Sequence, residues 1–575
     1  MNREEIMNIL PHRDNMLLLD DVENKNGTAV GHYTVRGDEF FLKGHFPDNP
    51  IVPGVILCEI LAQSACVLMQ DAMSEGKLPV YTGLNNVKFR SPVKPGDTVE
   101  TQCRIKRAKH PFYFAEGTVT VDGRLCVSAE FSFALTGAST MFSKILIANR
   151  GEIAVRIIRA CKEMGVATVA VYSEADKNAL HVALADQSYC IGGPEASESY
   201  LNENQIISTA ILAGAQAIHP GYGFLSENAH FARACRKNGL VFIGPDPESM
   251  ERLSDKAILK ELIRGTGLSV IPGTKAVASA QEAKRAADRI GYPVMLKACA
   301  GGGGRGIRLI RSEDELEDAY HQATSEAISA FGDGSVYLEK YVFPARHVEL
   351  QILADEHGNA VCLGDRDCSL QRRNQKLLEE TPSPAVSDEQ RQKIIELAVD
   401  AVKKIGYVGA GTLEFLLDRE GNFWFMEMNV RLQVEHCVTE MLTGFDLVKW
   451  QIRIAAGIPL NFTQKDVKIK GSAIECRINA GSCGALKMLH VPGGPSVRFD
   501  TCLVAGTVVS PYYDSLLGKL IVYAKTREET LRKMRAALCE LVIDGIPTNI
   551  EEQLRIVEDE RFTSGNYDLT FMGNR

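Results

Sequence analysis

At 575 residues the chain is too long for a single hydrophobic core, and its length suggests about four domains. A hydrophobic fraction of 45% and a charged fraction of 24% are ordinary for a globular protein. The net charge of −9 argues against a nucleic-acid partner, because phosphate binding requires a basic surface. No uncharged apolar run is long enough to span a membrane, and the charged opening residues predict no signal peptide. The 15 cysteines form no CxxC pair, which indicates free thiols in a reducing, cytoplasmic compartment.

The first segment of the chain, to about residue 137, predicts one long helix and several strands. The helix is predicted over residues 53–73 and begins with a proline, which suits a first helical turn. Because it is apolar nearly all round, we expect a sheet to wrap around it. The strands of this sheet are predicted over residues 81–89, 98–107, 112–121 and 125–135.

The pattern changes at residues 136–143, where a short polar stretch is followed by Met141. Residues 144–176 then predict strand, turn, amphipathic helix and strand, which is one βαβ unit of an open parallel sheet. Strands and helices alternate to about residue 250, and a glycine-rich stretch, antiparallel strands and a mixed α+β region follow. We interpret the join as two reading frames linked end to end; a translational restart at Met141 is the alternative.

His45 and Glu59 are the candidate catalytic residues of the first segment. His45 lies in a proline-rich loop just before the helix, and Glu59 lies about two turns inside it. A carboxyl group on an apolar helix is costly to desolvate, and burial favours its protonated form near neutral pH. A base and an acid at one apolar tunnel can eliminate water from a β-hydroxyacyl group. From these two residues alone, a structural hydrogen bond is the simpler interpretation.

The surrounding motifs favour chemistry. GHFPDNPIVPGVILCEILAQ (44–63), PHRDNMLLLDDV (11–22) and FRSPVKPGD (89–97) closely resemble the (3R)-hydroxyacyl-[acyl-carrier-protein] dehydratases, which have the hot-dog fold. The resemblance implies that His45 is the base and Glu59 the acid, contributed by opposite subunits of a dimer. It also implies that the Gly54 N–H at the helix N-terminus polarises the thioester carbonyl. Glu rather than Asp at position 59 favours dehydration without isomerisation.

Residues 427–435 alternate strictly between polar and apolar side chains, which predicts one extended strand with its polar residues on one face. A turn around Gly421 places Glu414 opposite Glu427 on a preceding strand, although a slip of one residue would separate them. Facing carboxylates favour a divalent cation between them, commonly Mg²⁺ with nucleotide phosphates. By pattern alone, a solvated strand face is the usual interpretation.

Phosphates also need positive charge and close approach of the backbone. Lys297 ends a strand just before Gly301, Gly302, Gly303 and Gly304, and Lys256 offers a second cation. A glycine run alone could be a flexible loop, but its place between this lysine and the acidic strands indicates a nucleotide site. No GxxxxGK[ST] motif occurs, so a P-loop is excluded.

The second segment resembles the biotin carboxylase family of ATP-grasp enzymes very closely. The resemblance rests on ILIANRGEIA (145–154), IHPGYGFLSEN (218–228), RDCSLQRRNQK (366–376), EMNVRLQVEH (427–436), ECRINA (475–480) and PYYDSLLGKL (511–520). The dehydratase resemblance implies an α+β hot-dog dehydratase domain over residues 1–138. The carboxylase resemblance implies an α/β pre-ATP-grasp domain, the carboxylase N-terminal domain, over 141–254. An ATP-grasp domain over 255–470 and an α+β C-terminal domain over 471–575 complete the expected order.

The resemblance also implies the roles of single residues. Glu435 is the general base, and Arg431 and Arg477 are catalytic, Arg477 by stabilising the enolate of biotin. Glu414, Glu427 and Asn429 bind Mg²⁺ or Mn²⁺. Bicarbonate and biotin are held by Lys376, Arg431, Gln433, Val434 and Arg477. ATP is held by Lys256, Lys297, Gly301, Gly302, Gly303, Gly304, Glu339, Lys340, Tyr341, Val342, His347 and Gln371.

We therefore expect a bifunctional enzyme of fatty acid biosynthesis, with ATP, Mg²⁺ and bicarbonate as cofactors or substrates and biotin bound to a carrier. No Met-Lys-Met biotinylation site occurs, so biotin should arrive on a separate biotin carboxyl carrier protein. Carboxyltransferase subunits and acyl carrier protein are further expected partners, and we expect a homo-oligomer. The alternative is an active carboxylase whose hot-dog domain only dimerises or docks carriers. Two departures from the family are Cys437, where proline is usual, and a shortened segment over residues 481–494.

Overall fold

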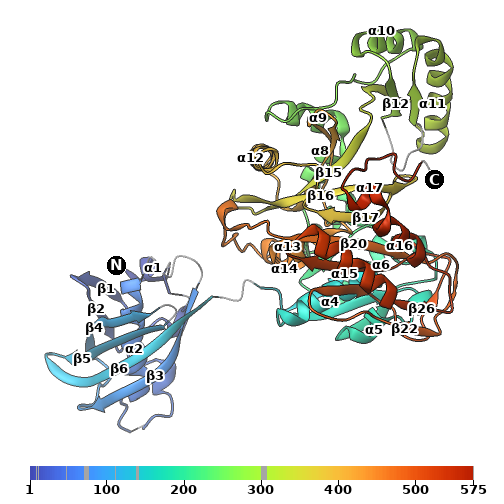
Figure 1. The fold of residues 1–575 in the computed structure, drawn as a ribbon. Coiled ribbons are helices and arrows are strands. Elements are labelled where there is room, and N and C mark those ends of the chain that lie inside the picture. Colours follow the sequence, from blue (N-terminus) through green and yellow to red (C-terminus); the bar gives the residue numbers. More distant parts are fainter. Residues whose placement is uncertain are drawn as a thin grey trace. The chain divides into compact units, whose positions relative to one another are not determined.

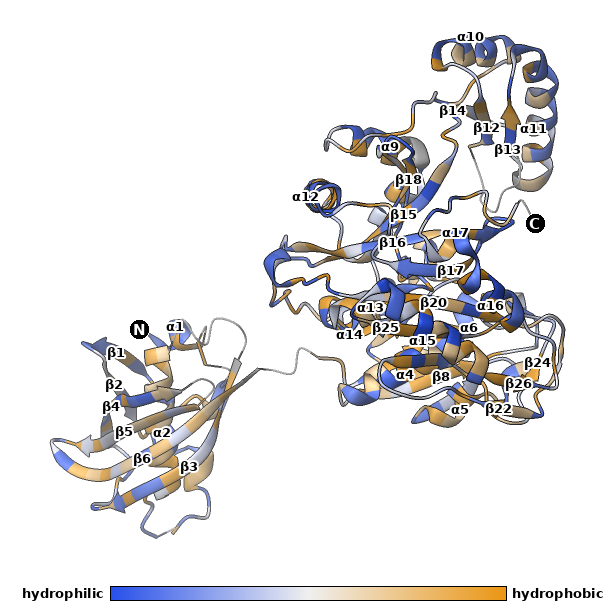
Figure 2. Cartoon of the chain, viewed as in Figure 1, coloured by the Kyte–Doolittle hydropathy of each residue, from blue (hydrophilic) through white to orange (hydrophobic). Residues whose placement is uncertain are grey.

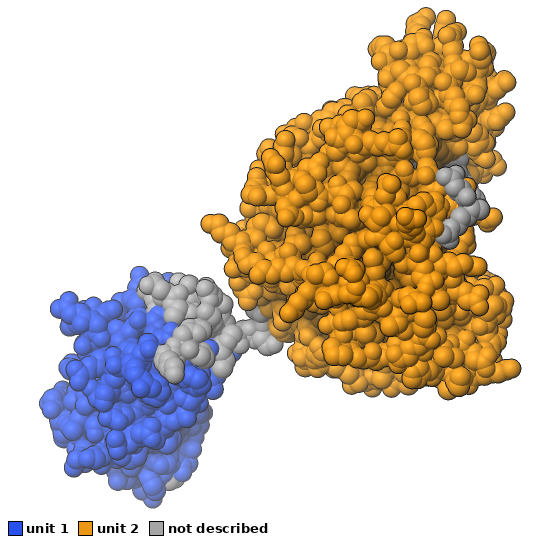
Figure 3. Space-filling view, in the orientation of Figure 1, with its two compact units in different colours: residues 1–140 blue, residues 141–575 orange. Residues whose placement is uncertain are grey.

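The computed structural model describes residues 1–573 except 8, 11, 47, 70–76, 110–111, 138–140 and 300–306. Side chains are also left undescribed for Lys77, Lys109, Thr136, Gly137, Lys256, Ala257 and Phe331. The chain forms two compact units, Met1–Thr140 and Met141–Arg575 (Figures 1 and 3).

The first unit is one antiparallel sheet with the order β1-β2-β4-β5-β6-β3. The predicted strands are confirmed, but the sequence interpretation missed the first two. The strands are β1 (Asp21–Lys25), β2 (Thr28–Thr34), β3 (Lys77–Phe89), β4 (Thr98–Lys109), β5 (Phe112–Val121) and β6 (Arg124–Gly137), preceded by helix α1 (Arg3–Met7).

Helix α2 (Gly54–Cys66) is the core of this unit. It packs against β2, β4, β5 and β6, which confirms the sheet expected around it (Figure 1). Leu57, Ile60 and Leu61 are buried among strand residues such as Val99 and Phe131. The predicted helix extended to residue 73, whereas the α-helix ends at Cys66 and a 3₁₀ turn follows over Val67–Met69.

The second unit begins with the predicted βαβ unit, formed by β7 (Lys144–Ile147), α4 (Gly151–Glu163) and β8 (Ala167–Tyr172). These strands belong to a parallel sheet of order β11-β10-β7-β8-β9. The other elements of this region are α5 (Leu180–Leu184), β9 (Gln187–Cys190), α6 (Glu203–Leu212), β10 (Ala217–His219), α7 (Ala229–Lys237), β11 (Val241–Phe242), α8 (Pro247–Ser254) and α9 (Lys256–Arg264).

A small lobe follows, in which a three-stranded antiparallel sheet of order β13-β12-β14 packs against two helices (Figure 1). The glycine-rich residues 300–306, which connect β12 to β13, lie outside the described residues. The elements are α10 (Ala280–Ile290), β12 (Val294–Ala298), β13 (Ile307–Ile310), α11 (Leu316–Phe331) and β14 (Val336–Lys340). Many residues of α10 are hydrophilic, as expected for a helix with one face in solvent (Figure 2).

An eight-stranded antiparallel sheet of order β19-β18-β15-β16-β17-β20-β25-β23 carries seven of the candidate site residues, His347, Gln371, Lys376, Glu414, Glu427, Asn429 and Arg477. Its strands are β15 (Ala345–Ala354), β16 (Ala360–Arg372), β17 (Gln375–Thr381), β18 (Gly409–Asp418), β19 (Phe423–Asn429), β20 (Ser472–Asn479), β23 (Val497–Thr501) and β25 (Leu516–Ala524). Helices α12 (Asp388–Ile405), α13 (His436–Thr443), α14 (Leu447–Ala455), α15 (Arg527–Glu540), α16 (Ile550–Glu558) and α17 (Glu560–Thr563) accompany it.

The shortened segment after β20 forms two small ladders. β21 (Gly484–Ala485) pairs with β24 (Val508–Val509), and β22 (Met488–His490) pairs with β26 (Val542–Asp544). Within the described residues, no helix is long and apolar enough to cross a bilayer.

Candidate active sites

In the first unit, His45 is fixed by its own loop. Its Nδ1 lies 3.0 Å from the carbonyl oxygen of Ile51. A carbonyl can only accept, so Nδ1 must donate this hydrogen bond. In the neutral ring, Nε2 is then the unprotonated nitrogen and can act as a base.

Glu59 is held from its own helix and from the N-terminal segment. Gln63, one turn further along α2, donates from Nε2 to Glu59 Oε1 at 2.9 Å, and His12 Nε2 lies 3.4 Å from the same oxygen. Gln63 is fixed in turn because it accepts a hydrogen bond from the N–H of Leu18 and donates to the carbonyl of Met16. The sequence interpretation assigned no role to His12 or Gln63, although the i, i+4 spacing of Glu59 and Gln63 was a usable signal.

Among the described residues of one chain, the polar contacts of His45 and Glu59 do not join the two side chains. At the start of α2, a Cβ on Gly54 would lie 2.4 Å from Cε1 of Phe89, so any larger residue would require this ring to move. The N-terminus of the helix is therefore closely approached by an aromatic ring from β3.

In the second unit, the register predicted for the acidic hairpin is confirmed. Glu414 of β18 lies opposite Glu427 of β19, and the turn contains Gly421 with φ +84°. The prediction of one extended strand over residues 427–435 is wrong, because β19 ends at Asn429 and α13 begins at His436. Bending after Asn429 buries both Gln433 and Glu435, although a straight strand was expected to place them beside Glu427.

Lys376 of β17 joins three carboxylates at the centre of the sheet. Its ammonium lies 2.6 Å from Glu435, 2.7 Å from Glu349 and 3.4 Å from Glu414. Burial opposes its charge, but these neighbours outweigh burial and raise the pKa of Lys376 well above its usual value. The lysine is therefore a fixed positive charge within this network.

Glu414 is also the centre of a polar shell. Asn429 Nδ2 and Gln433 Nε2 donate to its Oε1 at 2.6 and 3.0 Å, and His347 Nε2 lies 2.9 Å from its Oε2. Gln371 fixes the other ring nitrogen of His347 at 2.8 Å. Residues predicted to serve the metal, bicarbonate and ATP therefore meet around one carboxylate.

Two arginines approach this cluster from different elements. Arg431 donates to Gln433 at 2.9 Å and pairs with Glu227 at 3.0 Å. Arg477 of β20 reaches Glu435 at 2.9 Å and Glu379 at 2.5 Å. Each arginine thus contacts more than one side chain. A small anion could replace one of these contacts while the arginine keeps the other.

Glu435 is completely buried. Burial alone would raise its pKa, but Lys376, Arg477 and Arg366 outweigh burial and hold the pKa well below its usual value. The carboxyl group is therefore ionised, as a general base must be before it accepts a proton. Val434 lies beside it, and its carbonyl accepts a hydrogen bond from Lys519 at 2.8 Å.

Of the residues predicted to hold ATP, Lys297 and Glu339 lie together in the small lobe, with Lys297 Nζ 2.5 Å from Glu339 Oε2. Lys260, which the sequence interpretation did not name, pairs with the other oxygen of Glu339. Lys340 instead donates to the carbonyls of Gly291 and Tyr292. Val342 lies two residues after the end of β14. The predicted Lys256 side chain and Gly301 to Gly304 lie outside the described residues.

Tyr341 is half-buried, and its ring stacks on that of Phe343 with 5.2 Å between centroids. Such a stacked pair beside the residues predicted to hold ATP offers a flat apolar surface of the kind that suits a purine base.

The interior also holds charged residues that the sequence interpretation missed. Arg366 is fully buried and donates to Glu349, Gln351, Thr439 and Thr412. Its neighbour Cys368 lies 3.8 Å from Glu435. The sequence signal was the run of charged residues Asp365, Arg366 and Asp367 within the otherwise largely apolar strand β16. Charges buried in this way need partners at the same depth.

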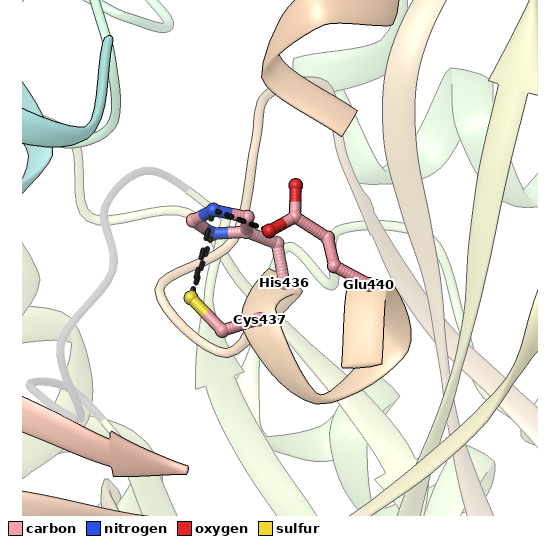
Figure 4. Close-up of side chains that lie close together, drawn as sticks. All are labelled: His436, Cys437 and Glu440. Carbon is pink, nitrogen blue, oxygen red and sulfur yellow. Dashed lines mark hydrogen bonds and ion pairs between the residues drawn. The ribbon is translucent and has the colours of Figure 1, made fainter. Parts of the chain in front are cut away.

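Figure 4 shows a separate buried cluster, His436, Cys437 and Glu440, at the start of α13. Their ligand atoms are close enough for a metal ion, but Glu440 is occupied by Arg156 at 2.8 Å and Arg498 at 2.7 Å. Cys437 Sγ lies 3.2 Å from Asp500. This cluster is a structural ion-pair network.

Family models match nearly the whole chain. The "FabA-like domain" matches residues 10–130, and the "Biotin carboxylase, N-terminal domain" matches 141–250. The "Carbamoyl-phosphate synthase L chain, ATP binding domain" matches 255–463, and the "Biotin carboxylase C-terminal domain" matches 475–574. The predicted order of fold classes is thereby confirmed.

Individual relatives agree. Biotin carboxylase 1 of Bacillus subtilis is 51% identical over 442 residues, which is 75% of this chain and 98% of that protein. The 2-oxoglutarate carboxylase small subunit of Hydrogenobacter thermophilus is 49% identical over 441 residues, 75% of this chain and 93% of that protein.

Solved structures extend this likeness to the fold. The biotin carboxylase–β,γ-ATP complex of Campylobacter jejuni covers 76% of this chain and all of that one, with 47% identity and a TM-score of 0.74. The biotin carboxylase domain dimer of the Hydrogenobacter thermophilus enzyme, in complex with MgADP, ADP and bicarbonate, has a TM-score of 0.72 and 49% identity. It covers 76% of this chain and 98% of that one. The chain belongs to the biotin carboxylase family and carries a FabA-like hot-dog domain before the carboxylase.

Proposed function

We propose that this chain performs two steps of fatty acid biosynthesis. The first unit dehydrates (3R)-hydroxyacyl-[acyl-carrier-protein] to the trans-2-enoyl product. The second unit uses ATP and bicarbonate to carboxylate biotin on a separate carrier protein, which is the first half-reaction of acetyl-CoA carboxylase.

The observation that carries the carboxylase proposal is the position of Lys376. One ammonium group contacts Glu435, the proposed base, at 2.6 Å and Glu414, a proposed metal ligand, at 3.4 Å. A bicarbonate ion bound at Lys376 would therefore meet the base and the metal site together. Arg431, Gln433 and the Val434 backbone surround the same position and complete the anion site.

The donor set fits magnesium. Glu414, Glu427 and Asn429 offer only oxygen ligands, and the two carboxylates face one another across β18 and β19. A bound Mg²⁺ would neutralise charge on the ATP phosphates during phosphoryl transfer. Crystal complexes of relatives with MgADP, bicarbonate and an ATP analogue support these ligands for the present chain.

The residues divide the chemistry between them. Glu435 removes the proton of bicarbonate, whose oxygen then attacks the γ-phosphorus of ATP and gives carboxyphosphate. Lys297 and Lys256 balance the charge of the phosphates. Carboxyphosphate breaks down into CO₂ and phosphate, the phosphate accepts the N1 proton of biotin, and N1 then captures the CO₂ while Arg477 pairs with the negative ureido oxygen.

In the first unit, the fixed tautomer of His45 supports its role as the base that removes a proton from the acyl chain. Glu59, supported by Gln63 and His12, protonates the leaving hydroxyl group. Because one chain does not bring these side chains into contact, we assign the complete site to a dimer in which each subunit supplies one of them. The N–H of Gly54 then polarises the thioester carbonyl.

The partners follow from these reactions. A biotin carboxyl carrier protein and carboxyltransferase subunits would serve the second unit, and acyl carrier protein the first. Two relatives are named as subunits of carboxylases that act on other acceptors, a 2-oxoglutarate carboxylase and a pyruvate carboxylase. Acetyl-CoA as the final acceptor for this chain is therefore part of the proposal.

The experiment is a paired assay on one purified species of 63.0 kDa, with its intact mass measured. We expect bicarbonate-dependent ADP release stimulated by free biotin, and hydration of a crotonyl-carrier substrate in the reverse of dehydration. Carboxylation without hydration would favour a hot-dog domain that only docks or dimerises. Two smaller chains in the intact mass would indicate translation from Met141.

A further inference from the structure

Strands β17 and β20 place two buried carboxyl groups side by side. Glu379 and Glu475 are direct cross-strand neighbours, and both are completely buried. Arg477 follows two residues after Glu475 on β20, so its side chain leaves the same face of the sheet. The proposed mechanism uses Arg477 but neither of these glutamates.

The two carboxyl groups differ in their partners. Glu379 Oε1 accepts from Arg477 Nε at 2.7 Å, whereas its Oε2 is buried without a hydrogen-bond partner. Both oxygens of Glu475 are buried without a hydrogen-bond partner, and no ion pair to it occurs among the described residues. The nearest lysine on the adjacent strand, Lys519, is directed instead to Glu152 at 3.0 Å and to the Val434 carbonyl.

Every other buried carboxylate of this network has a cation. Glu349 has Arg366 and Lys376, Glu414 has Lys376 and His347, and Glu435 has Lys376 and Arg477. An ionised carboxylate with no such partner is strongly disfavoured in a protein interior, and a like charge directly across the strand disfavours it further. The geometry therefore favours the protonated form of Glu475.

The electrostatics of the surrounding elements agree. Burial raises the pKa of Glu475 well above its usual value; Lys519 of β25 and Arg477 lower it only in part, and Glu379 and Glu435 raise it further. Burial also raises the pKa of Glu379 to about 7, although Arg477 and Lys376 oppose this shift. Of the two groups, Glu379 is thus the easier to ionise.

We propose that Glu475 is a protonated positioning residue, whose neutral carboxyl leaves Glu379 alone to orient Arg477 and keeps the guanidinium charge available to an anion. The proposal deepens the carboxylase function and rests on it: the anion is the negative ureido oxygen of biotin. With Glu475 ionised, Glu379, Glu435 and Glu475 would together surround one guanidinium group. Its attraction for a further negative oxygen would then fall.

The test is Glu475→Gln, which is neutral at every pH and nearly the same shape. At pH 7 we expect biotin-dependent carboxylation within about twofold of the unchanged enzyme, since Gln replaces a neutral acid of similar shape. At alkaline pH the unchanged enzyme loses this activity as Glu475 ionises, and the variant should keep it to a pH at least one unit higher. Bicarbonate-dependent ATP hydrolysis without biotin forms no negative ureido oxygen for Arg477 to pair with, so its pH profile should be the same in both proteins.

The proposal would be overturned if the variant lost biotin-dependent carboxylation tenfold at pH 7 while keeping ATP hydrolysis. It would also be overturned if carboxylation by the variant and by the unchanged enzyme declined at the same alkaline pH. If the unchanged enzyme shows no bicarbonate-dependent ATP hydrolysis, the proposed function itself fails, which is a distinct outcome. Should the variant not fold, infrared spectra of the unchanged enzyme still decide. A carboxylic-acid C=O band that persists above pH 7 is expected, and the absence of any such band contradicts a protonated Glu475.

Discussion

The two candidate active sites differ in how much of each one chain completes. In the second unit, Lys376 and Arg477 both contact Glu435 within one chain, and Glu435 is completely buried. In the first unit, His45 and Glu59 are each fixed by their own neighbours but are not joined to each other. The difference teaches that a buried cluster of charges must be balanced within one fold. A histidine and a carboxyl group that are fixed separately can instead form a site once a second subunit supplies the missing partner.

The largest expected effect is that of Glu435→Gln on the carboxylase. The amide cannot accept a proton, so we expect bicarbonate-dependent ATP cleavage to fall by about 10³-fold or more. The dehydratase rate of the same preparation should stay within about twofold. Tryptophan fluorescence, which comes from the second unit, serves as the folding control. A parallel loss of both activities would show that the two units are coupled and would break the comparison.

His45→Ala tests the first unit in the same way. Loss of the base should lower crotonyl-carrier hydration by about 10²- to 10³-fold and leave carboxylation unchanged. Lys25→Ala, which changes an exposed residue of β1 that pairs with Glu23, is the matched control. Hydration that survives His45→Ala would support a docking domain rather than an enzyme.

Complementation sharpens the comparison directly. If two subunits share each dehydratase site, mixing His45→Ala and Glu59→Gln chains should restore hydration to about a quarter of the unchanged rate, since half of the dimers are hybrids with one intact site. An equal mixture of Glu435→Gln and Arg477→Ala chains should restore no carboxylation. Rescue in the second mixture, or its absence in the first, contradicts the difference described above.

Acid should affect the second unit through Glu440. Burial disfavours its ionised form, but Arg156, His436 and Arg498 outweigh burial and lower its pKa to about 2. Its stabilisation is therefore complete above pH 4.5 and is lost as the pH falls through about 2, an effect on the order of 3 kcal/mol. Trp424 and Trp450, the only two tryptophans, both lie in this unit, so tryptophan fluorescence reports its unfolding alone. Glu440→Gln should remove this contribution already at neutral pH and flatten the acid dependence.

The smallest effect concerns the support of Glu59. Gln63→Ala removes one hydrogen bond to the carboxyl and two to the N-terminal segment, and we expect the hydration rate to fall by about three- to tenfold. Gln63→Glu keeps the shape but places two carboxyl groups together, and its pH profile should shift upward on the acid side. A rate unaffected by Gln63→Ala would mean that His12 alone suffices.

The sequence predicted most of the elements and the register of the acidic hairpin, because alternation and the turn at Gly421 act locally. It failed where the chain leaves its pattern: the polar–apolar alternation continues to Glu435, yet the strand ends at Asn429. The local sequence does not distinguish a strand that continues to Glu435 from one that ends at Asn429. The bend depends instead on the packing of helix α13 against β20 and β25. Glu349, Arg366 and Glu475 were missed for a related reason, since their significance depends on which cations lie on neighbouring strands.

Arg366 has a consequence for any attempt to redesign the carboxylase. One guanidinium group donates to Glu349, Gln351, Thr412 and Thr439, and thereby ties three strands of the sheet to α13. Lysine could preserve the charge but not this planar four-way geometry. This one side chain, which no substrate needs to touch, thus helps to set the distance between α13, which follows Glu435, and β18, which carries Glu414. Substitutions confined to the residues that line the pocket would leave that distance unchanged.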